Sequence, residues 1–460
     1  MILKHLKTAI QSAQKCPTKY TEVKEALAKK PRSIVILDDD PTGTQTVHDV
    51  PVVTQWAEDV LEWELLNSPV FFILTNSRSM VPKKAEDLGK SIGKLLYKLA
   101  KKHNKNLLVI SRSDSTLRGH YPNEVNALAR GLNLHNPKHL IVPAFFEGGR
   151  YTYNDMHYVQ EENTLVPVGE TPFAQDSAFG FSSSNLKDWI LEKGNGTIMP
   201  DTIKSISVHD LEEGGHIKAK AVLNSNSTYF VVNATHISHL QTIALACLDC
   251  DYPILYRTAA SFINAIAAIE PRECLQKRDI ITTAENGANL TLIGSYVPKT
   301  TEQLNVLKEN YDATFLELNV ANAMQPSLFQ KELEHITYQV DTAIAKGRNV
   351  VVYTSRKMLM GTSKTQNLEI INSVSKGLLT IVNSLKHRPK CILAKGGITS
   401  SDIATKGLGA QRAMVLGQIQ KGIPVWKLGR NAKFPGLKYI VFPGNVGNKN
   451  TLFEVLKQLE

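Results

Sequence analysis

The stretch Ser33-Ile-Val-Ile-Leu-Asp-Asp-Asp-Pro-Thr-Gly-Thr44 shows the pattern that decides the fold class. Residues 33–37 form a short β-branched, apolar run of strand length, and turn residues follow it directly. Similar strands recur along the chain, and helical patterns lie between them, for example at 83–102 and 124–132. This alternation is typical of α/β units around a mainly parallel sheet.

The other predicted strands lie in both halves of the chain. They cover residues 70–75, 106–111, 139–143, 228–233, 290–293, 313–318, 349–354, 390–394 and 438–442. A length of 460 residues favours at least two domains. We therefore predict an α/β protein of two domains, each with a mainly parallel sheet flanked by helices, and an active site in the cleft between them.

The predicted domain bounds follow from these elements. Residues 1–32 form an N-terminal helical extension, 33–270 a first domain, 271–288 a linker and 289–460 a second domain. The linker is placed at 271–288 because that stretch is polar and has no clear period. The segment 1–10 lacks the continuous apolar core of a secretory signal, and an ordinary first helix is expected there.

The formal net charge of +10, from 53 Lys and Arg against 43 Asp and Glu, raises the question of an anionic partner. The basic residues come in short groups, such as Lys83-Lys84 and Lys101-Lys102-His103, with acids nearby. No basic run of the kind that binds nucleic acid occurs, and no apolar run reaches the ~18 residues of a membrane span. Small acidic ligands are the remaining class of partner.

Cysteine usage favours a reducing, cytoplasmic location. The five cysteines are too few and too widely spaced to stabilise a chain of this length through disulfide bonds. Cys247 and Cys250 form a CxxC pair, but no second pair supplies the other ligands of a zinc site. No metal site made of protein ligands is therefore predicted.

Three strands of the second half end in glycine turns that lead into helical patterns. The turns are Gly294-Ser295, Lys395-Gly-Gly-Ile-Thr399 and Gly444-Asn-Val-Gly447. A helix N-terminus preceded by glycine is a phosphate site, because free N–H groups and peptide dipoles point at the anion. Thr399 and Asp402 have the spacing of a capping box, so a helix is expected to start there. Neither a GxxxxGK[ST] nor a GxGxxG motif occurs, and we predict a nucleoside triphosphate across this sheet edge.

Acidic and basic side chains gather at the strand ends of the first half. Asp38-Asp-Asp40 follows the first strand, and Ser111-Arg-Ser-Asp-Ser-Thr-Leu-Arg-Gly-His120 contains two arginines, a carboxylate and hydroxyls. Arg78 and Arg150 follow two further strands. Arginine binds carboxylates through paired hydrogen bonds, and Asp, Ser and Thr suit sugar hydroxyls, so a polyhydroxylated acid would fit. His48, His120 and His157 are interpreted as surface or core histidines.

At Asp39-Asp-Pro-Thr-Gly43, Asp114-Ser-Thr-Leu-Arg-Gly119, Gly396-Gly-Ile-Thr399 and Gly444-Asn-Val-Gly447, the chain resembles the four-carbon acid sugar kinase family. Its members phosphorylate threonate, erythronate or 3-oxo-tetronate with ATP. The resemblance runs from about residue 33 to the end of the chain. It implies that the first domain binds the sugar acid and the second binds ATP.

The resemblance also implies roles for individual residues. On the nucleotide side these are Gly294, Ser295, Gly396, Gly397, Ile398, Thr399, Gly444 and Gly447. On the substrate side they are Asp39, Thr42, Gly43, Arg78, Arg112, Ser115, Thr116, Arg118 and Arg150, and the segment 171–176 is expected to support the same pocket. Arg112 stands where the family commonly has Lys, and His120 where it has Asn, so these departures lie on the substrate side.

The expected mechanism is phosphoryl transfer from ATP, with Mg²⁺ bridging two phosphates. A carboxylate of the first domain would orient or deprotonate the acceptor hydroxyl. We favour Asp40 for this catalytic role, and Asp114 is the second choice. Arg118 and Arg112 would pair with the substrate carboxylate.

Two other classes of function remain open at this stage. A sugar-acid dehydrogenase could use the same sheet edges, although the chain has no nicotinamide fingerprint. A non-catalytic nucleotide-binding or effector protein of the same fold would bind ATP without forming product. A homodimer is a further expectation.

Overall fold

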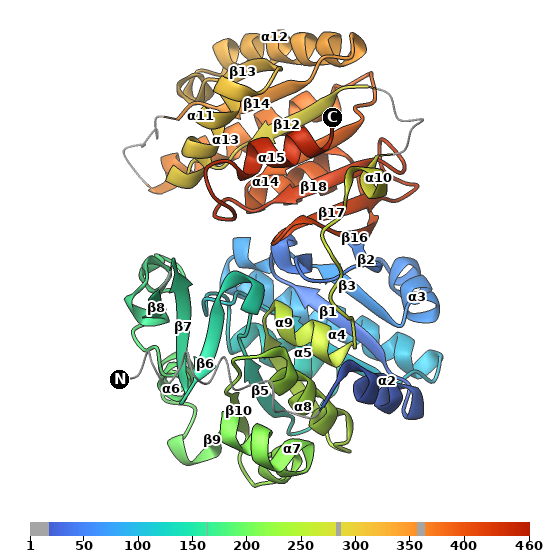
Figure 1. Cartoon of the computed structure of the whole chain (residues 1–460), viewed down its shortest axis with the longest axis vertical. Helices are drawn as coiled ribbons and strands as arrows, with labels where there is room; N and C mark the ends of the chain where they lie inside the picture. Colours follow the sequence, from blue (N-terminus) through green and yellow to red (C-terminus); the bar gives the residue numbers. More distant parts are fainter. Residues whose placement is uncertain (1–17, 163, 282–286, 357–363) are drawn as a thin grey trace. The chain divides into compact units, whose positions relative to one another are not determined.

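The computed structural model describes residues 18–162, 164–281, 287–356 and 364–460 (Figure 1). The chain divides into two compact units, the first ending at Pro271 and the second beginning at Arg272. The helix expected at 1–10 lies outside the described residues. The described part of the extension contains helix α2 (Tyr20–Lys29).

A parallel sheet forms the centre of the first unit, and every strand pairing recorded within it is parallel. In spatial order its strands are β2 (Val50–Val53), β3 (Val70–Leu74), β1 (Ser33–Asp38), β4 (Leu107–Arg112), β11 (Ile254–Thr258), β5 (Lys138–Val142), β10 (Tyr229–Val232) and β9 (Ile203–Ile206). A small antiparallel sheet of β6 (Arg150–Tyr153), β7 (Met156–Glu161) and β8 (Thr164–Pro167) accompanies it.

Helices bury the apolar side chains of this sheet. Val35 and Leu37 of β1 pack with buried residues of α3 (Glu58–Asn67) and α4 (Pro82–Lys102). Trp189 of α6 (Leu186–Gly194) packs with Ile141 and Leu255. The helices of the unit are α2, α3 (Glu58–Asn67), α4 (Pro82–Lys102), α5 (Asn123–Gly131), α6 (Leu186–Gly194), α7 (Val208–Leu223), α8 (Ile237–Leu248) and α9 (Ala260–Ile266). The helices expected at 83–102 and 124–132 are therefore present, each shifted by one residue at its start.

Strand β11 was not predicted, although it lies in the middle of the sheet between β4 and β5. Arg257 interrupts its apolar run, and an arginine inside a short run argues against a buried strand. In the folded chain this side chain is 1% exposed and lies over the Trp189 ring, 5.3 Å from its centre. Tertiary contacts thus outweigh the local signal.

Two glycines allow α4 and α5 to touch backbone to backbone. A methyl group on Gly93 would lie 2.7 Å from the Leu128 carbonyl oxygen and 3.0 Å from the Gly131 Cα. We expect Gly93→Val to lower the free energy of unfolding of the first unit by about 1–3 kcal/mol, since the helices must separate. Ser91→Val changes an exposed position on the same helix and should cost less than about 0.5 kcal/mol. Urea titration of both variants measures the difference, and equal midpoints would contradict this packing.

The second unit is built around strands in the order β13 (Thr314–Leu318), β14 (Val350–Thr354), β12 (Asn289–Ile293), β15 (Cys391–Lys395), β18 (Lys438–Phe442), β17 (Ile423–Leu428) and β16 (Arg412–Gln420). The pairings from β13 to β18 are parallel, whereas β17 runs antiparallel to both of its neighbours. Its helices include α11 (Pro298–Asn310), α12 (Pro326–Ala345), α13 (Lys364–Asn383), α14 (Gly397–Asp402) and α15 (Thr451–Gln458). The hairpin of β16 and β17 was not predicted, although buried and partly exposed positions alternate along β16 as in a half-buried strand.

The stretch predicted as a linker contains structure that packs into the second unit. Residues 277–280 form the short helix α10 (Lys277–Ile280). Leu275, Ile280 and Ile281 are buried in the core of the second unit together with Leu304 and Leu452. A few apolar residues in a polar segment were enough to anchor it.

The predicted fold class is confirmed, since each unit is an α/β structure with a mainly parallel sheet flanked by helices. Within the described ranges, no helix combines the length and the apolar character needed to cross a membrane.

Candidate functional site

The register of the first sheet places three predicted strand ends next to one another. Asp38, the last residue of β1, pairs with Leu74 of β3 on one side and with Arg112 of β4 on the other. The loops that follow these strands therefore leave the sheet side by side. They contain most of the candidate residues of the first unit.

Arg78 is the centre of this cluster. It follows β3 in a short helical turn (Ser77–Ser79) whose preceding residue, Asn76, has a left-handed φ of 53°. Its Nη2 and Nε donate to the two carboxylate oxygens of Asp39 at 2.6 and 3.2 Å. Its Nη1 lies 3.4 Å from Asp40 Oδ2 and 4.0 Å from Asp114 Oδ1. Burial alone would lower the pKa of Arg78, but these three carboxylates raise it well above its usual value.

Asp40 caps the short 3₁₀ helix Pro41–Thr44. Its Oδ1 accepts hydrogen bonds from the backbone N–H of Thr42 at 2.9 Å and from the Thr42 hydroxyl at 2.5 Å. Burial acts to raise the pKa of Asp40, but Arg78 and the Thr42 hydrogen bonds outweigh it and lower the pKa. The side chain of Asp40 is 20% exposed against 4% for Asp39 and 12% for Asp114. Asp40 is thus an ionised carboxylate and the most accessible of these three.

Asp38 and Arg112 form a more deeply buried pair. Arg112 Nη1 lies 3.3 Å from Asp38 Oδ1, and both side chains are at most 5% exposed. Asp38 Oδ2 has no hydrogen-bond partner within the described residues, and any side chain at Gly43 would collide with it. Burial raises the pKa of Asp38 to about 7, although Arg112 acts in the opposite direction. Because Gly43 has no side chain, its backbone can pack directly against the Asp38 carboxyl group.

Asp114 and Arg118 form an ion pair in the loop after β4. Arg118 Nε lies 2.6 Å from Asp114 Oδ2, which also accepts the Thr116 hydroxyl. Arg118 Nη1 lies 3.6 Å from Asp176, and its guanidinium lies over the Phe173 ring, 5.0 Å from the centre. Burial would raise the pKa of Asp114, but Arg118 and Arg78 together hold it far below its usual range.

The other candidates of the first unit take supporting positions. The Ser115 carbonyl accepts from His157 Nε2 at 2.7 Å, and His157 is fully buried, so it is a core histidine as predicted. His120 Nε2 lies 3.1 Å from the Ser77 carbonyl. Arg150 bonds to the Gly148 carbonyl and lies over the Phe145 ring, without a direct contact to the aspartates.

His48 lies apart from the cluster. Its Nδ1 is 3.0 Å from Asp49 Oδ2, and its Nε2 is 2.9 Å from the Glu270 carbonyl oxygen.

Sequence reasoning missed Arg257 and Glu124. Arg257 donates to the Arg118 carbonyl at 3.3 Å, whereas its Nε and Nη1 have no partner within the described residues. Burial lowers the pKa of Arg257 to about 10 despite the attraction of Asp114 and Asp39. Burial also raises the pKa of Glu124 to about 7, against a hydrogen bond from Ser77. In the sequence, Arg257 stands out only as a single cation inside an apolar run of strand length.

In the second unit, Ser295 lies between two glycine turns. The N–H groups of Gly294 and Ser295 both donate to the Lys395 carbonyl at 3.2 Å, and a Cβ on Gly396 would lie 3.2 Å from Ser295 Cβ. A Cβ on Gly444 would lie 2.9 Å from Ser295 Oγ. The glycines leave open the space around this hydroxyl that side chains would fill.

Further hydrogen bonds hold these turns in place. The Thr300 hydroxyl lies 3.2 Å from both Ser295 Oγ and the Gly444 carbonyl oxygen. Arg356, which sequence reasoning also missed, donates from Nη1 to the Ser295 carbonyl at 2.8 Å. The Gly396 N–H, in one of the turns expected to bind phosphate, donates to the Phe442 carbonyl at 2.8 Å.

Helix α14 starts earlier than the capping-box motif suggested. Gly396, with a left-handed φ of 121°, is its N-cap, and Thr399 lies inside the first turn without a capping hydrogen bond. Asp402 instead accepts from Ser375 at 2.9 Å and pairs with Lys406. The first N–H groups of this helix therefore begin at Gly397 and are not capped by a side chain.

Ile398 and Gly447 complete the predicted nucleotide residues. Ile398 is 54% exposed at the start of α14. Gly447 has φ of 82° and comes before helix α15, where a Cβ would lie 2.5 Å from the Thr451 hydroxyl oxygen. Both residues follow strand ends of the parallel sheet.

Lys395 is a third missed residue of the second unit. It ends β15 fully buried, donates to the Pro443 carbonyl at 3.2 Å and lies 3.7 Å from the centre of the Phe442 ring. Burial, with a smaller contribution from the charge of Lys299, lowers the pKa of Lys395 to about 7. The signal available was a lysine directly before a Gly-Gly turn at the end of an apolar strand.

Comparison with known proteins agrees with this division. A family model described as the sugar-binding N-terminal domain matches residues 34–266, and one described as the nucleotide-binding C-terminal domain matches residues 290–452. The chain is thus a two-domain protein of the sugar-binding and nucleotide-binding class. It belongs to the four-carbon acid sugar kinase family, whose architecture is this pair of domains.

Solved structures show the same fold at low sequence identity. A Salmonella typhimurium LT2 protein, provisionally described as a tRNA synthase, matches with a TM-score of 0.68 and 16% identity over 93% of this chain and 99% of its own. A Haemophilus influenzae protein of the DUF1537 family matches with a TM-score of 0.62 and 18% identity over 93% of this chain and 100% of its own. None of the curated proteins matches the chain.

Proposed function

We propose that the protein is a kinase that transfers the γ-phosphoryl group of ATP to a hydroxyl group of a four-carbon sugar acid of the threonate, erythronate or 3-oxo-tetronate type. The observation that carries the proposal is the cluster of Arg78, Arg112, Arg118 and the aspartates at one sheet edge, in a chain whose second domain belongs to a nucleotide-binding family. In such a reaction the protein positions the acceptor and neutralises charge.

The acidic and basic cluster supplies both kinds of contact that a sugar acid needs. Arg118 and Arg112 bind the substrate carboxylate, because a guanidinium matches a carboxylate with paired hydrogen bonds. Asp39, Thr42, Ser115 and Thr116 bind hydroxyl groups or hold the loops that do so. Arg78 favours the ionised forms of Asp40 and Asp114 and holds Asp39 in place through two hydrogen bonds. Gly43 keeps the turn close to Asp38.

Asp40 accepts the proton of the attacking hydroxyl. Its support is its exposure and its ionised state, both of which a proton acceptor requires. The hydroxyl oxygen then forms the new P–O bond, the bond to the β-phosphate oxygen breaks, and ADP leaves. Asp114 is the second candidate, because its side chain is 12% exposed against 20% for Asp40.

The nucleotide is held by the glycine turns around Ser295. Gly397 and the next N–H groups of α14, with Gly444 and Gly447, offer backbone donors to phosphate oxygens. Within the described residues no group of three His, Cys, Asp or Glu side chains could hold a metal ion. Mg²⁺ keeps several waters and prefers substrate phosphates, so it would arrive on the ATP and supply charge neutralisation there.

A screen of four-carbon sugar acids tests the proposal. Each acid is incubated with ATP and Mg²⁺, and ADP release and product mass are measured. One acid should give ADP and a product heavier by one phosphoryl group. Binding of ATP without product from any acid would favour a non-catalytic effector, and reduction of NAD(P) by a sugar acid would favour a dehydrogenase.

Replacing the turn glycines should strongly weaken nucleotide binding. A side chain at Gly444 meets Ser295 Oγ, so Gly444→Val closes the space beside that hydroxyl. We expect Gly444→Val and Gly397→Val each to weaken ATP binding by at least about 100-fold, the loss of roughly two charged hydrogen bonds. Calorimetric titration of ATP measures this. Ala345→Val, at an exposed position at the end of α12 in the same unit, is the control. Unaltered affinity in both site variants would rule out these turns as the nucleotide site.

Nucleotide binding should also take up a proton through Lys395. Because its pKa is about 7, most Lys395 side chains are neutral at pH 8. Phosphate charge near the turn favours the ammonium form and raises this pKa, so protons enter from solvent. Calorimetry of ATP binding at pH 8 in two buffers of different ionisation enthalpy counts them. Lys395→Met should remove the uptake and the exposed Lys457→Met should not; equal uptake in all three proteins would contradict the role.

A cytoplasmic location and a homodimer remain predictions from the sequence. The cysteines in the described part of the chain, Cys247, Cys250, Cys274 and Cys391, are free thiols, which is compatible with a reducing compartment.

A further inference from the structure

A hollow of the first unit lies at the opposite edge of its sheet from the acidic and basic cluster. Its volume is about 440 Å³, and it is lined by Leu107 and Ile254, the first residues of β4 and β11. Arg112, at the other end of β4, belongs to the cluster. At about 3.3 Å per residue, β4 separates the two places by roughly 17 Å. The hollow is therefore not part of the proposed substrate site.

The lining of the hollow is positively charged. Arg32, Lys101 and Lys105 contribute to it, and it contains no aspartate or glutamate. In the part of the chain that the structure describes, neither Lys101 nor Lys105 has an ion pair or a hydrogen bond from its ammonium group. Arg32 donates one hydrogen bond, from Nη2 to the Leu248 carbonyl at 2.9 Å. Most of the donor capacity of these three side chains is thus unused.

The nearby carboxylates pair mainly with other lysines, although Asp251 also interacts electrostatically with Arg32. Asp249 and Asp251 follow helix α8. Arg32 donates to the carbonyl of Leu248, the last residue of that helix. Asp249 pairs with Lys220 at 2.6 Å, and Asp251 pairs with Lys30 at 3.0 Å. Both acids are therefore already paired with lysines that do not line the hollow.

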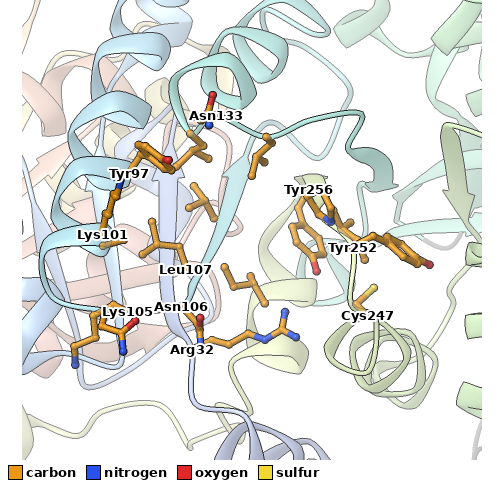
Figure 2. A pocket seen from close by; sticks show the side chains of 18 residues that line it. Arg32, Tyr97, Lys101, Lys105, Asn106, Leu107, Asn133, Cys247, Tyr252 and Tyr256 are labelled. Carbon is orange, nitrogen blue, oxygen red and sulfur yellow. The ribbon is translucent and has the colours of Figure 1, made fainter.

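Aromatic and apolar side chains form the rest of the wall. Figure 2 shows Tyr97 and Lys101 on one side of the hollow and Tyr252 and Tyr256 on the other, with Arg32 between them. Apolar residues of the β4 strand, including Leu108, lie among them. A volume of 300 Å³ or more with a mixed apolar and polar wall is typical of small-molecule sites.

We propose that this hollow binds a small organic anion with a flat apolar body, of the aromatic phosphate or carboxylate class. The tyrosines and leucines contact the body, and Arg32, Lys101 and Lys105 bind the anionic group. The anionic group alone is not sufficient for binding, because the lysines are solvent-exposed and an inorganic ion would keep its hydration shell there. The apolar body of the ligand must therefore contribute as well. The proposal does not depend on the kinase reaction.

Calorimetric titration of the full chain with phenyl phosphate tests the proposal. We expect a dissociation constant below about 1 mM. Inorganic phosphate, which lacks the ring, and benzyl alcohol, which lacks the charge, should each bind at least about tenfold more weakly. Equal binding of inorganic phosphate, or no binding of phenyl phosphate, overturns the proposal.

Paired variants locate the binding. Lys101→Gln with Lys105→Gln should weaken phenyl phosphate about tenfold, and these exposed positions should tolerate the change without unfolding. Lys90→Gln with Lys94→Gln removes two exposed charges from the same helix α4 away from the hollow and should leave affinity unchanged. Arg78→Lys should also leave it unchanged. A loss in either control that equals the loss in the first pair places the ligand elsewhere and contradicts the proposal.

Discussion

Asp40→Asn should reduce phosphoryl transfer to the sugar acid by about 10² to 10⁴-fold, the usual contribution of a positioned proton acceptor. Asparagine cannot take the proton, but it has nearly the same shape and is also a good N-cap. The turn Pro41–Thr44 should therefore persist. The kcat for ADP release at saturating ATP and acid measures the loss, while the ATP dissociation constant should not change.

The matched control for this change is Asp59→Asn, at an exposed position of helix α3. It removes one carboxylate from the same unit and should keep full activity. If Asp40→Asn retains the wild-type kcat, the proton acceptor is another group. Asp114→Asn would then be the next variant to measure.

Arg78→Met should cause the largest combined loss of activity and stability. It leaves Asp39 without its two strongest hydrogen bonds and removes the cation next to Asp40 and Asp114. Breaking a buried pair costs about 3–5 kcal/mol, because the remaining charge is unpaired. We expect the free energy of unfolding of the first unit to fall by that amount and kcat/KM to fall by at least about 100-fold.

Two further variants separate the possible causes. Arg78→Lys keeps the charge but loses the paired hydrogen bonds to Asp39, so its effects should be smaller than those of Arg78→Met but clearly measurable. Arg130→Met, at an exposed position of α5, should change neither stability nor activity. Urea titration and initial rates are compared across the three proteins. Wild-type stability in Arg78→Met would show that the ion pairs contribute little.

Much of the framework followed from local pattern. The strand at 438–442 was predicted with the bounds that the structure has, since its apolar run ends directly at the Pro443-Gly444 turn. Strand β11 was missed because Arg257 lies inside its apolar run, and β16 was missed although its alternating burial is that of a half-buried strand. Local propensity is weak where tertiary contacts decide.

The candidate site was predicted to a similar degree. Asp39, Asp40 and Arg78 could be placed near one another, because the ends of neighbouring parallel strands meet at one sheet edge. Arg257 and Lys395 were missed, since a single cation inside or at the end of an apolar run can mark the end of a strand as well as a buried charge. The capping box at Thr399 failed for a related reason, because the left-handed Gly396 starts the helix first.

Periodicity and turn residues along the chain were thus sufficient to predict two α/β domains and to locate the strand ends that hold polar residues. The motifs at those strand ends carried the resemblance to the sugar-acid kinase family. The pairing of charges was decided only by the fold. Which arginine binds which aspartate depends on strand order, and β1 lies between β3 and β4 although β2 and β3 follow it in sequence. Burial then sets the pKa values, because desolvation depends on neighbours that are distant along the chain.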